Sequence, residues 1–419
     1  MGPRTALTSR ALIQADLPDN FTHALYKIAP YRGCGHGCRY CDGRAERYYV
    51  QGDFERDIEV RDGLPACLAY ELPRLREHGI IAFGSGVTDP YQPIENDFCI
   101  TRACASLLAA PRRTSWTQAS LGILYPDRNE AATPLPAMVM TKSARALRDL
   151  DLWSKVNTAA GFILLVSLTS LDESVRETME PNASTFAERL ALLREFKRAG
   201  CIVGVLAMPL LPGISDGEES LGHLLSGCEK IGVDFLMPGG LTLRPGRQKD
   251  LFVQTLTEDY PQLRSLYDFL YNENRVSGAP IAKYSAELHA RLRKLRQNHP
   301  LPWLLPHRSF ARLLPVHDAL RILFQDMIEL YTDAGIGTAT LRGCAERYDA
   351  WLLDRRRFFR RHRTLPPGWL ETILLDALGS GDLKNVFDNP KLLDFTTAIV
   401  RDGARFDYHS LSLQGGARG

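Results

Sequence analysis

The chain has 419 residues, more than a typical single domain, so we expect either one large barrel with additions or two packed units. Hydrophobic residues make up 45% and charged residues 24%, as in an ordinary globular protein. The formal net charge of +2 excludes a strong overall attraction to polyanions, so any basic patch must be local.

The start of the chain and its apolar runs argue against export and membrane insertion. Residues 1–20 contain no basic stretch followed by an apolar run and a cleavage site, and Ala6 stands where a myristoylation signal needs Ser or Thr. The longest apolar runs, near Phe162–Leu168 and Cys201–Leu211, are well short of the roughly 20 residues that span a bilayer. We expect a cytoplasmic protein without membrane contact, with residues 1–20 as a flexible tail.

Residues 21–250 alternate short apolar runs with amphipathic stretches, a pattern typical of repeated βα units around a parallel sheet. Six runs are predicted to be strands: Leu25–Ile28, Ile80–Phe83, Met138–Thr141, Phe162–Leu168, Ile202–Met208 and Val233–Met237. Four stretches between them have helical periodicity: Thr101–Ala110, Ala144–Val156, Thr185–Ala199 and Glu218–Ile231, with Gly200 and Gly232 as C-caps. We predict an α/β fold, a partial (β/α)6 barrel whose functional residues follow the carboxyl ends of the strands.

Two segments depart from this alternation. Residues 111–136 are polar and contain prolines, and they are much longer than a usual connection, so we expect a mobile surface insertion. Residues 251–419 lose the strand signal and are predicted to form a mainly helical C-terminal region. Its expected helices are Leu263–Asn272, Ala286–Gln297, Ala319–Asp333 and Glu346–Arg363, followed by a frayed end at Gly415–Gly419.

Three of the nine cysteines lie within eight residues, directly after the first predicted strand. Cys34, Cys38 and Cys41 have the spacing C-x3-C-x2-C, and the glycines between them allow a loop to wrap tightly around an iron-sulfur cluster. Three cysteines leave one iron of a 4Fe-4S cubane open, as in catalytic metal sites. The alternative is a zinc site completed by His36, although paired C-x2-C units, the usual zinc pattern, are absent.

The other six cysteines are scattered, and we expect most of them to be small buried side chains.

The cysteine motif, with Tyr40 before its last cysteine, resembles the signature of the radical S-adenosylmethionine (SAM) superfamily. Four further stretches resemble its spore photoproduct lyase-related branch, in particular the members of undefined substrate: Thr88–Glu95, Met140–Ser143, Val166–Leu168 and Met208–Gly213. The resemblance implies a 4Fe-4S cluster and SAM as cofactors, with the reduced cluster cleaving SAM to a 5′-deoxyadenosyl radical that abstracts hydrogen from substrate. It also implies an electron donor, a reductase or a flavodoxin- or ferredoxin-type protein.

The same resemblance assigns candidate SAM-binding residues. These are Gly84, Ser85 and Gly86 after the second strand, with Thr88, Lys142 and Ser167 at strand ends. Lys142 suits the SAM carboxylate as a point charge with three donors. Asp89 and Glu95 are candidates for the ribose or a substrate, although Asp89, which precedes Pro90, is more typical of a turn.

Two positions depart from the spore photoproduct lyases. Gly86 aligns with their hydrogen-donating cysteine, and Asp42 replaces their tyrosine after the third cluster cysteine. We therefore do not expect the chain to repair spore photoproduct by that route.

A basic segment near the C-terminus suggests a further partner. Arg356, Arg360 and Arg363 within Arg355–Arg363 have helical spacing and would form a basic stripe that contacts the phosphates of a nucleic acid, unless the stripe is a solvated face or pairs with acidic neighbours.

Three hypotheses follow: a radical SAM enzyme acting on nucleic acid or a nucleotide-like substrate, the same enzyme class acting on a peptide or small molecule, and a non-catalytic zinc or iron-sulfur module. The sequence does not identify the catalytic residues, the substrate, the fate of SAM or the oligomeric state.

Overall fold

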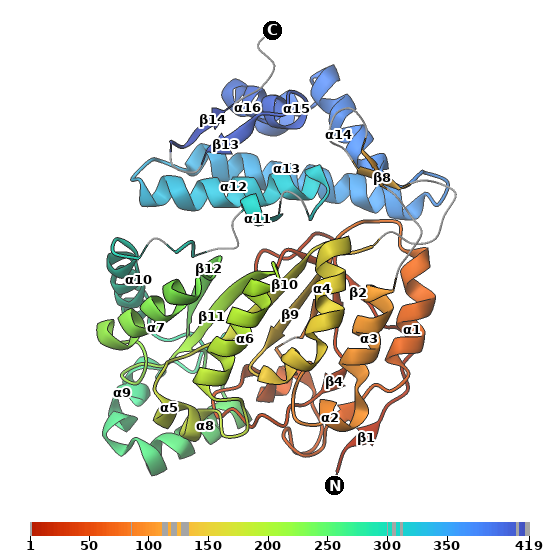
Figure 1. Ribbon diagram of the computed structural model, residues 1–419. Coiled ribbons are helices and arrows are strands. Elements are labelled where there is room, and N and C mark those ends of the chain that lie inside the picture. The colour runs from red at the N-terminus through yellow and green to blue at the C-terminus, as the bar shows by residue number, and fades with distance from the viewer. Residues whose placement is uncertain are drawn as a thin grey trace.

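The computed structural model describes residues 2–84, 86–110, 116–118, 124–126, 134–299, 301–303, 307–310, 313–407 and 410–414. In Figure 1 a sheet flanked by helices forms the larger part of the molecule, and a helical bundle covers one end of it. Among the described residues, no helix is both long enough and apolar enough to cross a bilayer.

The central sheet has seven strands in the order β12-β11-β10-β9-β6-β3-β2, and β2 and β12 form its two edges. Its strands are β2 (Ile13–Gln14), β3 (Ala24–Ile28), β6 (Ile80–Phe83), β9 (Ala137–Thr141), β10 (Phe162–Ser167), β11 (Ile202–Leu210) and β12 (Phe235–Gly240). Within this sheet, the six strands other than β2 are all parallel, whereas β2 is antiparallel to β3. The predicted α/β fold and its six parallel strands are confirmed, and the last strand is displaced toward the C-terminus.

The strands read as continuous apolar runs because both faces of the sheet are covered. On one face, alternate side chains such as Phe162, Leu164 and Val166 pack against the outer helices. These helices are α1 (Leu64–Glu71), α3 (Ile100–Ala109), α4 (Leu150–Ala159), α6 (Phe186–Arg198) and α7 (Glu218–Ile231). On the other face, Ile163 and Leu165 pack in a separate cluster with residues of the C-terminal bundle. Positive φ angles at Gly200 and Gly232 confirm both predicted helix ends.

The N-terminal residues are not a tail. β1 (Arg4–Thr5) pairs with β5 (Glu59–Val60), which also pairs with β4 (Tyr31–Arg32), while β2 extends the central sheet. Ala11 and Leu12 are buried in the main core. The expectation of a flexible segment over residues 1–20 is therefore wrong: these short strands carry too few residues to show a periodic pattern.

Three short pieces of the predicted insertion at 111–136 are described. β7 (Trp116–Gln118) and β8 (Leu124–Pro126) form an antiparallel pair, and residues 134–136 lead into β9. The expected mobility of the other residues, and the expected fraying at Gly415–Gly419, fall outside the described residues.

The predicted boundary at residue 251 does not separate two cores. The helices α8 (Arg247–Asp259), α9 (Arg264–Leu270) and α10 (Ala282–Arg296) contribute Phe252, Tyr267 and Leu288 to the core of the sheet. A second core is built by α12 (Val316–Asp333), α13 (Ala339–Arg361), α14 (Trp369–Ser380), α15 (Leu383–Phe387) and α16 (Pro390–Val400), with the hairpin of β13 (Arg405–Asp407) and β14 (Ser412–Gln414). Helical periodicity located the helices but did not show which core they join.

The C-terminal bundle covers the amino ends of the strands. Phe310 of α11 (His307–Phe310), together with Leu313 and Ile322, packs against Ile80 and Met138, which lie near the starts of β6 and β9. The opposite, carboxyl end of the sheet remains free of the bundle (Figure 1).

The predicted basic stripe on α13 is largely an internal contact. Arg356 has no exposed surface, and its side chain lies 2.6 Å from Glu77 and 2.7 Å from Asp318. Arg360 pairs with Glu77 at 2.6 Å and with Asp16 at 3.2 Å. These two arginines attach the bundle to residues that flank the central sheet, so they are not a surface for phosphate contact, and the predicted basic stripe is wrong. Arg363 lies beyond the helix and is exposed.

Candidate active site

The loop after β3 brings the three motif cysteines to the carboxyl end of the sheet. Cys34, Cys38 and Cys41 all line one cavity of about 500 Å³, a size typical of ligand pockets. Gly33 and Gly37 have φ angles of 86° and 68°, in the left-handed region that favours glycine. A Cβ at Gly33 would also lie 2.9 Å from the Phe54 carbonyl oxygen, so the tight path of the loop requires glycine there.

Side chains from two other loops hold the cysteine loop in place. Gln92 accepts a hydrogen bond from the Gly35 amide at 2.7 Å and donates to the Gly33 carbonyl at 3.1 Å. From the loop after α5 (Glu173–Met179), the Asn182 side chain donates to the Gly35 carbonyl at 3.1 Å. The backbone of the loop is therefore fixed independently of the thiols, which remain directed to the cavity.

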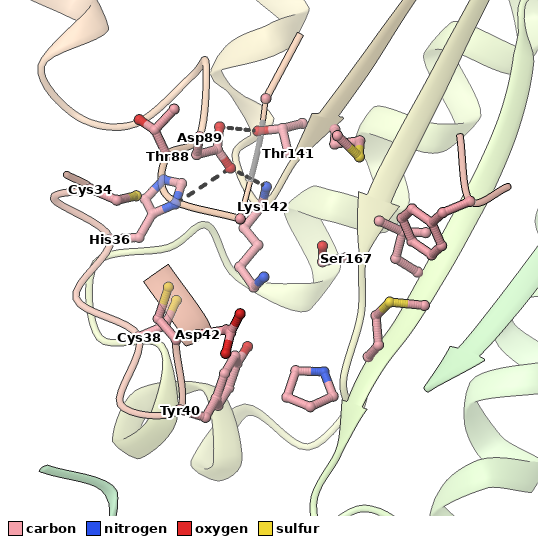
Figure 2. Close-up of a pocket in the computed structure, with 18 of the residues that line it drawn as sticks. Cys34, His36, Cys38, Tyr40, Asp42, Thr88, Asp89, Thr141, Lys142 and Ser167 are labelled. Carbon is pink, nitrogen blue, oxygen red and sulfur yellow. Dashed lines mark hydrogen bonds and ion pairs between the residues drawn. The ribbon is translucent and has the colours of Figure 1, made fainter. Parts of the chain in front are cut away.

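Asp89 connects the cysteine loop to the end of β9. Its carboxylate accepts hydrogen bonds from the Tyr91 amide (2.8 Å), the Thr141 hydroxyl (2.8 Å) and the Lys142 amide (2.7 Å), and it lies 3.5 Å from His36 Nδ1 (Figure 2). The turn role predicted for Asp89 is confirmed by the Tyr91 contact. With four neighbours, this carboxylate positions the site and has little capacity left for a ligand.

His36 lies between Cys34 and Cys38 in the sequence. Its side chain is buried and lies beside Cys34 in Figure 2. Burial lowers the pKa of His36 to about 4, so its ring is neutral. Its Nε2 atom is buried and has no hydrogen-bond partner. Within the described part of the chain, however, no three His, Cys, Asp or Glu side chains are arranged around a point that could hold one metal ion.

Lys142 extends from the end of β9 into the same cavity (Figure 2). Its ammonium lies 5.7 Å from the centroid of the Tyr40 ring and, within the described residues, makes no hydrogen bond or ion pair. Burial acts to lower the pKa of Lys142, but the Cys38 thiol and the Glu180 carboxylate outweigh it and raise the pKa. The cavity therefore contains a cation that the protein itself does not neutralise by contact.

Behind Tyr40 lies a buried polar network that the sequence analysis did not find. The Tyr40 hydroxyl donates to Glu180, which also pairs with Arg189 of α6. Arg189 donates to the Ser167 carbonyl at 3.0 Å and so reaches the end of β10. Glu180 and Arg189 belong to no recognisable motif, so no signal in the sequence marks them.

Burial affects the three motif thiols in the same way. It raises the pKa of Cys38 to about 12 and also raises the pKa of Cys34 and Cys41, because a thiolate would lose its hydration there. Bound metal ions reverse this preference, since they bind the thiolate directly. Three such thiols on one cavity are a donor set that suits iron or another thiophilic metal.

Most of the predicted cofactor-binding residues meet at this cavity. Gly84, Gly86, Thr88, Lys142 and Ser167 all line it together with the three cysteines. Ser85 lies outside the described residues. The Thr88 hydroxyl donates to the Gly33 carbonyl at 2.9 Å, so it holds the cysteine loop in addition to facing the cavity.

Glu95, a candidate for ribose or substrate, has a different role. It has no exposed surface and accepts hydrogen bonds from Tyr31, from the Thr101 amide (3.0 Å) and from Arg148 (2.7 Å). Glu95 therefore stabilises the start of α3 and does not contact a ligand.

The positions that depart from the spore photoproduct lyases both line the cavity. Asp42 pairs with Arg244 and accepts from the Tyr48 hydroxyl, both at 2.6 Å. A Cβ at Gly86 would lie 3.6 Å from the same Tyr48 hydroxyl. No thiol is therefore present where the aligned cysteine would stand.

The sequence analysis also did not identify the cavity-lining residues that come before the cysteine loop. Asp19, Phe21, Thr22 and Lys27 line the cavity from the segment before β3 and from β3 itself. Met140, Leu206 and Met208 also line the cavity.

The cysteine loop lies in a region of the chain that matches known proteins. The model of the Radical SAM superfamily matches residues 28–225. Uncharacterized protein Rv2578c of Mycobacterium tuberculosis is 30% identical over 251 residues, which are 59% of this chain and 67% of that protein. Uncharacterized protein MJ0683 of Methanocaldococcus jannaschii is 24% identical over 246 residues, 58% of this chain and 80% of that protein.

Among solved structures, spore photoproduct lyase complexed with dinucleoside spore photoproduct aligns with a TM-score of 0.49 and 18% identity over 70% of this chain and 79% of that chain. The match to the family model, which includes the cysteine loop and the strands β6, β9, β10 and β11, identifies the family. The chain belongs to the radical SAM superfamily of enzymes.

Proposed function

We propose that the chain is a radical SAM enzyme of the spore photoproduct lyase-related branch, with a 4Fe-4S cluster held by Cys34, Cys38 and Cys41. One observation carries the proposal: the three thiols line a single cavity with the ammonium of Lys142, which forms no ion pair with any residue that the structure describes. The branch assignment rests on the sequence motifs that surround this cavity, Thr88–Glu95 and Met140–Ser143 among them.

The arrangement of the ligands supports a cluster over the zinc alternative. A cubane takes each cysteine on a different iron, so its ligands surround a volume, whereas a zinc ion needs four ligands around one point. The described residues contain no group of three that could converge on one ion. Fixing of the loop by Gln92 and Asn182 would keep the thiols in place when the cluster is absent.

When bound, the reduced cluster supplies the electron that cleaves SAM to a 5′-deoxyadenosyl radical, which abstracts hydrogen from the substrate. Lys142 would bind the SAM carboxylate, because its ammonium lines the cavity with the cysteines and has no hydrogen-bond or ion-pair partner in the described part of the chain. Gly84 and Gly86 would let the SAM amino group approach the backbone after β6, and Ser167 would face the cofactor from the end of β10. Ser85 remains a prediction.

The substrate is either nucleotide-like, including nucleic acid, or a peptide or small molecule. Repair of spore photoproduct by the route of the spore enzyme is not proposed, because Gly86 offers no hydrogen-donating thiol and Asp42 is held by Arg244 and Tyr48. A reductase or a flavodoxin- or ferredoxin-type protein would supply the electron.

The test is anaerobic reconstitution of the full chain with iron and sulfide. We expect about four irons per chain and dithionite-dependent formation of 5′-deoxyadenosine from SAM. Cys38→Ala should lose both, whereas Cys228→Ala, which changes a buried thiol of α7 outside the site, should keep both. A Cys38→Ala protein that still cleaves SAM would reject the site assignment.

A further inference from the structure

The charged groups that line the cavity differ in how many hydrogen bonds and ion pairs they form with the protein. The lining includes three carboxylates, Asp19, Asp42 and Asp89, and two ammonium groups, Lys27 and Lys142. Asp42 and Asp89 are held by the partners described above. Both lysines, in contrast, keep hydrogen-bond donors that no group among the described residues uses, and Lys142 is already assigned to SAM.

The Asp19 carboxylate accepts its hydrogen bonds from the turn in which it lies. Its Oδ1 accepts from the Phe21 amide at 3.0 Å and from the Thr22 amide at 2.6 Å, and its Oδ2 accepts from the Thr22 hydroxyl at 2.6 Å. These contacts and Lys27 lower the pKa of Asp19, although burial acts against them. Asp19 is thus an ionised group that shapes the turn.

Lys27 is held only loosely. Its Nζ lies 3.4 Å from Asp19 Oδ2, longer than the 2.7–2.9 Å of a strong charge-assisted hydrogen bond, and 49% of its side chain is exposed. An ammonium group has three donors. Within the described residues Lys27 makes no other ion pair or hydrogen bond through this group, so at least two of its donors are not used by the protein, and Lys27 lines the cavity.

The sheet register places the two lysines far apart. Lys27 of β3 is level with Ala82 of β6, which is level with Met138 of β9. Lys142 follows Met138 by four residues, so the two lysines are separated by about 13 Å along the strands. Lys27 is therefore at the end of the cavity away from Lys142 and the cysteines beside it, and Met140, Leu206 and Met208 also line the cavity.

The wall around Lys27 is also fixed in advance. The segment that contains Asp19 is attached to the C-terminal bundle, because Arg321 donates to the Pro18 carbonyl at 3.0 Å and Gln325 donates to Asn20 at 2.8 Å. Binding to a fixed wall costs less ordering than binding to a loose loop.

We infer that Lys27 binds an anionic group of the substrate, a phosphate or a carboxylate, at the end of the cavity opposite the cysteines. This inference rests on the proposed function. The body of such a substrate would lie along Met140, Leu206 and Met208, with Phe21 beside its anionic end, so that a C–H bond is directed toward the cysteine end. A phosphate corresponds to the nucleotide-like hypothesis, and a carboxylate to the peptide or small-molecule hypothesis.

The experiment uses the full chain, reconstituted with iron and sulfide and saturated with SAM, so that Lys142 is occupied. Inorganic phosphate and acetate are the two probes, each titrated at constant ionic strength with chloride as reference. Acylation of Lys27, followed by mass spectrometry, reports occupancy of its ammonium, and calorimetry gives the affinity. Iron content and thermal unfolding of each variant show that it is folded.

We expect one of the anions to protect Lys27 in the wild-type protein. Lys27→Gln should weaken its binding about tenfold or more, the loss typical of one charge-assisted contact. Lys27→Arg should retain binding, and Lys155→Gln, on the exposed side of α4, should not change it. Protection by phosphate favours a phosphate-bearing substrate, and protection by acetate favours a carboxylate.

Three results would overturn the inference: no binding of either anion, equal affinity in the wild type and Lys27→Gln, or protection of Lys27 by SAM alone. The last result would assign Lys27 to the cofactor. Failure of the proposed function is distinguishable, because it appears as missing iron or missing SAM cleavage in the wild-type chain.

Discussion

Lys142 and Arg356 are both cations inside the molecule, but they are near opposite ends of the strands and have different neighbours. Arg356, at the contact between the bundle and the region of the central sheet, pairs with Glu77 and Asp318. Lys142, at the carboxyl ends of the strands, faces a cavity and pairs with no acidic side chain in the described part of the chain. A buried cation that forms ion pairs with carboxylates holds two parts of a fold together, whereas a cation that faces a cavity is available to a ligand.

The largest effect on folding is expected at the paired cation. Arg356→Ala would remove the guanidinium that pairs with buried Asp318 and with one oxygen of Glu77, whose other oxygen still pairs with Arg360. The change should lower the free energy of unfolding by about 3–5 kcal/mol. Chemical denaturation followed by circular dichroism measures this. Arg357→Ala is the matched control, because its pair with Asp16 is exposed and should contribute at most about 1 kcal/mol. Equal midpoints for the two variants would show that the buried pair does not hold the bundle.

The next effect concerns the cation without a partner. Lys142→Met should bind SAM more weakly by about 1.5–3 kcal/mol, which is tenfold or more, because it removes a charge-assisted contact. Iron content should stay unchanged, since Lys142 is not a metal ligand. Titration of reconstituted protein with SAM measures the affinity, with Lys155→Met on α4 as control. Unchanged affinity would contradict the assignment of Lys142 to the SAM carboxylate.

Features that depend on nearby residues were predictable. The strand β10 and the cysteine loop are each defined by a short local pattern, and both are where the sequence places them. The partner of a charged residue is not local: Arg360 and Glu77 are 283 residues apart, so a basic helical face looks the same whether it meets solvent or carboxylates. The two-residue strand β2 and the ion pair of Glu180 with Arg189 produce no periodic pattern in the sequence.

The smallest effect is a pH dependence within the paired region. His317 is buried, with Nδ1 at 3.1 Å from Glu371 and Nε2 at 3.6 Å from Asp318 and 3.2 Å from Arg356. Burial and Arg356 act to lower the pKa of His317, but the two carboxylates outweigh them and raise it. The folded protein therefore keeps this proton to a higher pH than the unfolded chain, where histidine titrates near 6.5.

It follows that the stabilisation from His317 is complete below about pH 6.5 and is lost as the pH rises through the folded pKa. His317→Gln should be most destabilising at low pH, and its penalty should decrease with rising pH by at most about 1.4 kcal/mol per unit, the limit for one proton. Denaturant unfolding of both proteins between about pH 6 and pH 9 measures the difference. Burial lowers the pKa of His23 and His78 to about 4, but both proteins retain these residues, so their effect cancels in the difference. A penalty that is constant or increases with pH would mean that His317 is neutral in the folded protein and adds no charge to the contact of Arg356 with its two carboxylates.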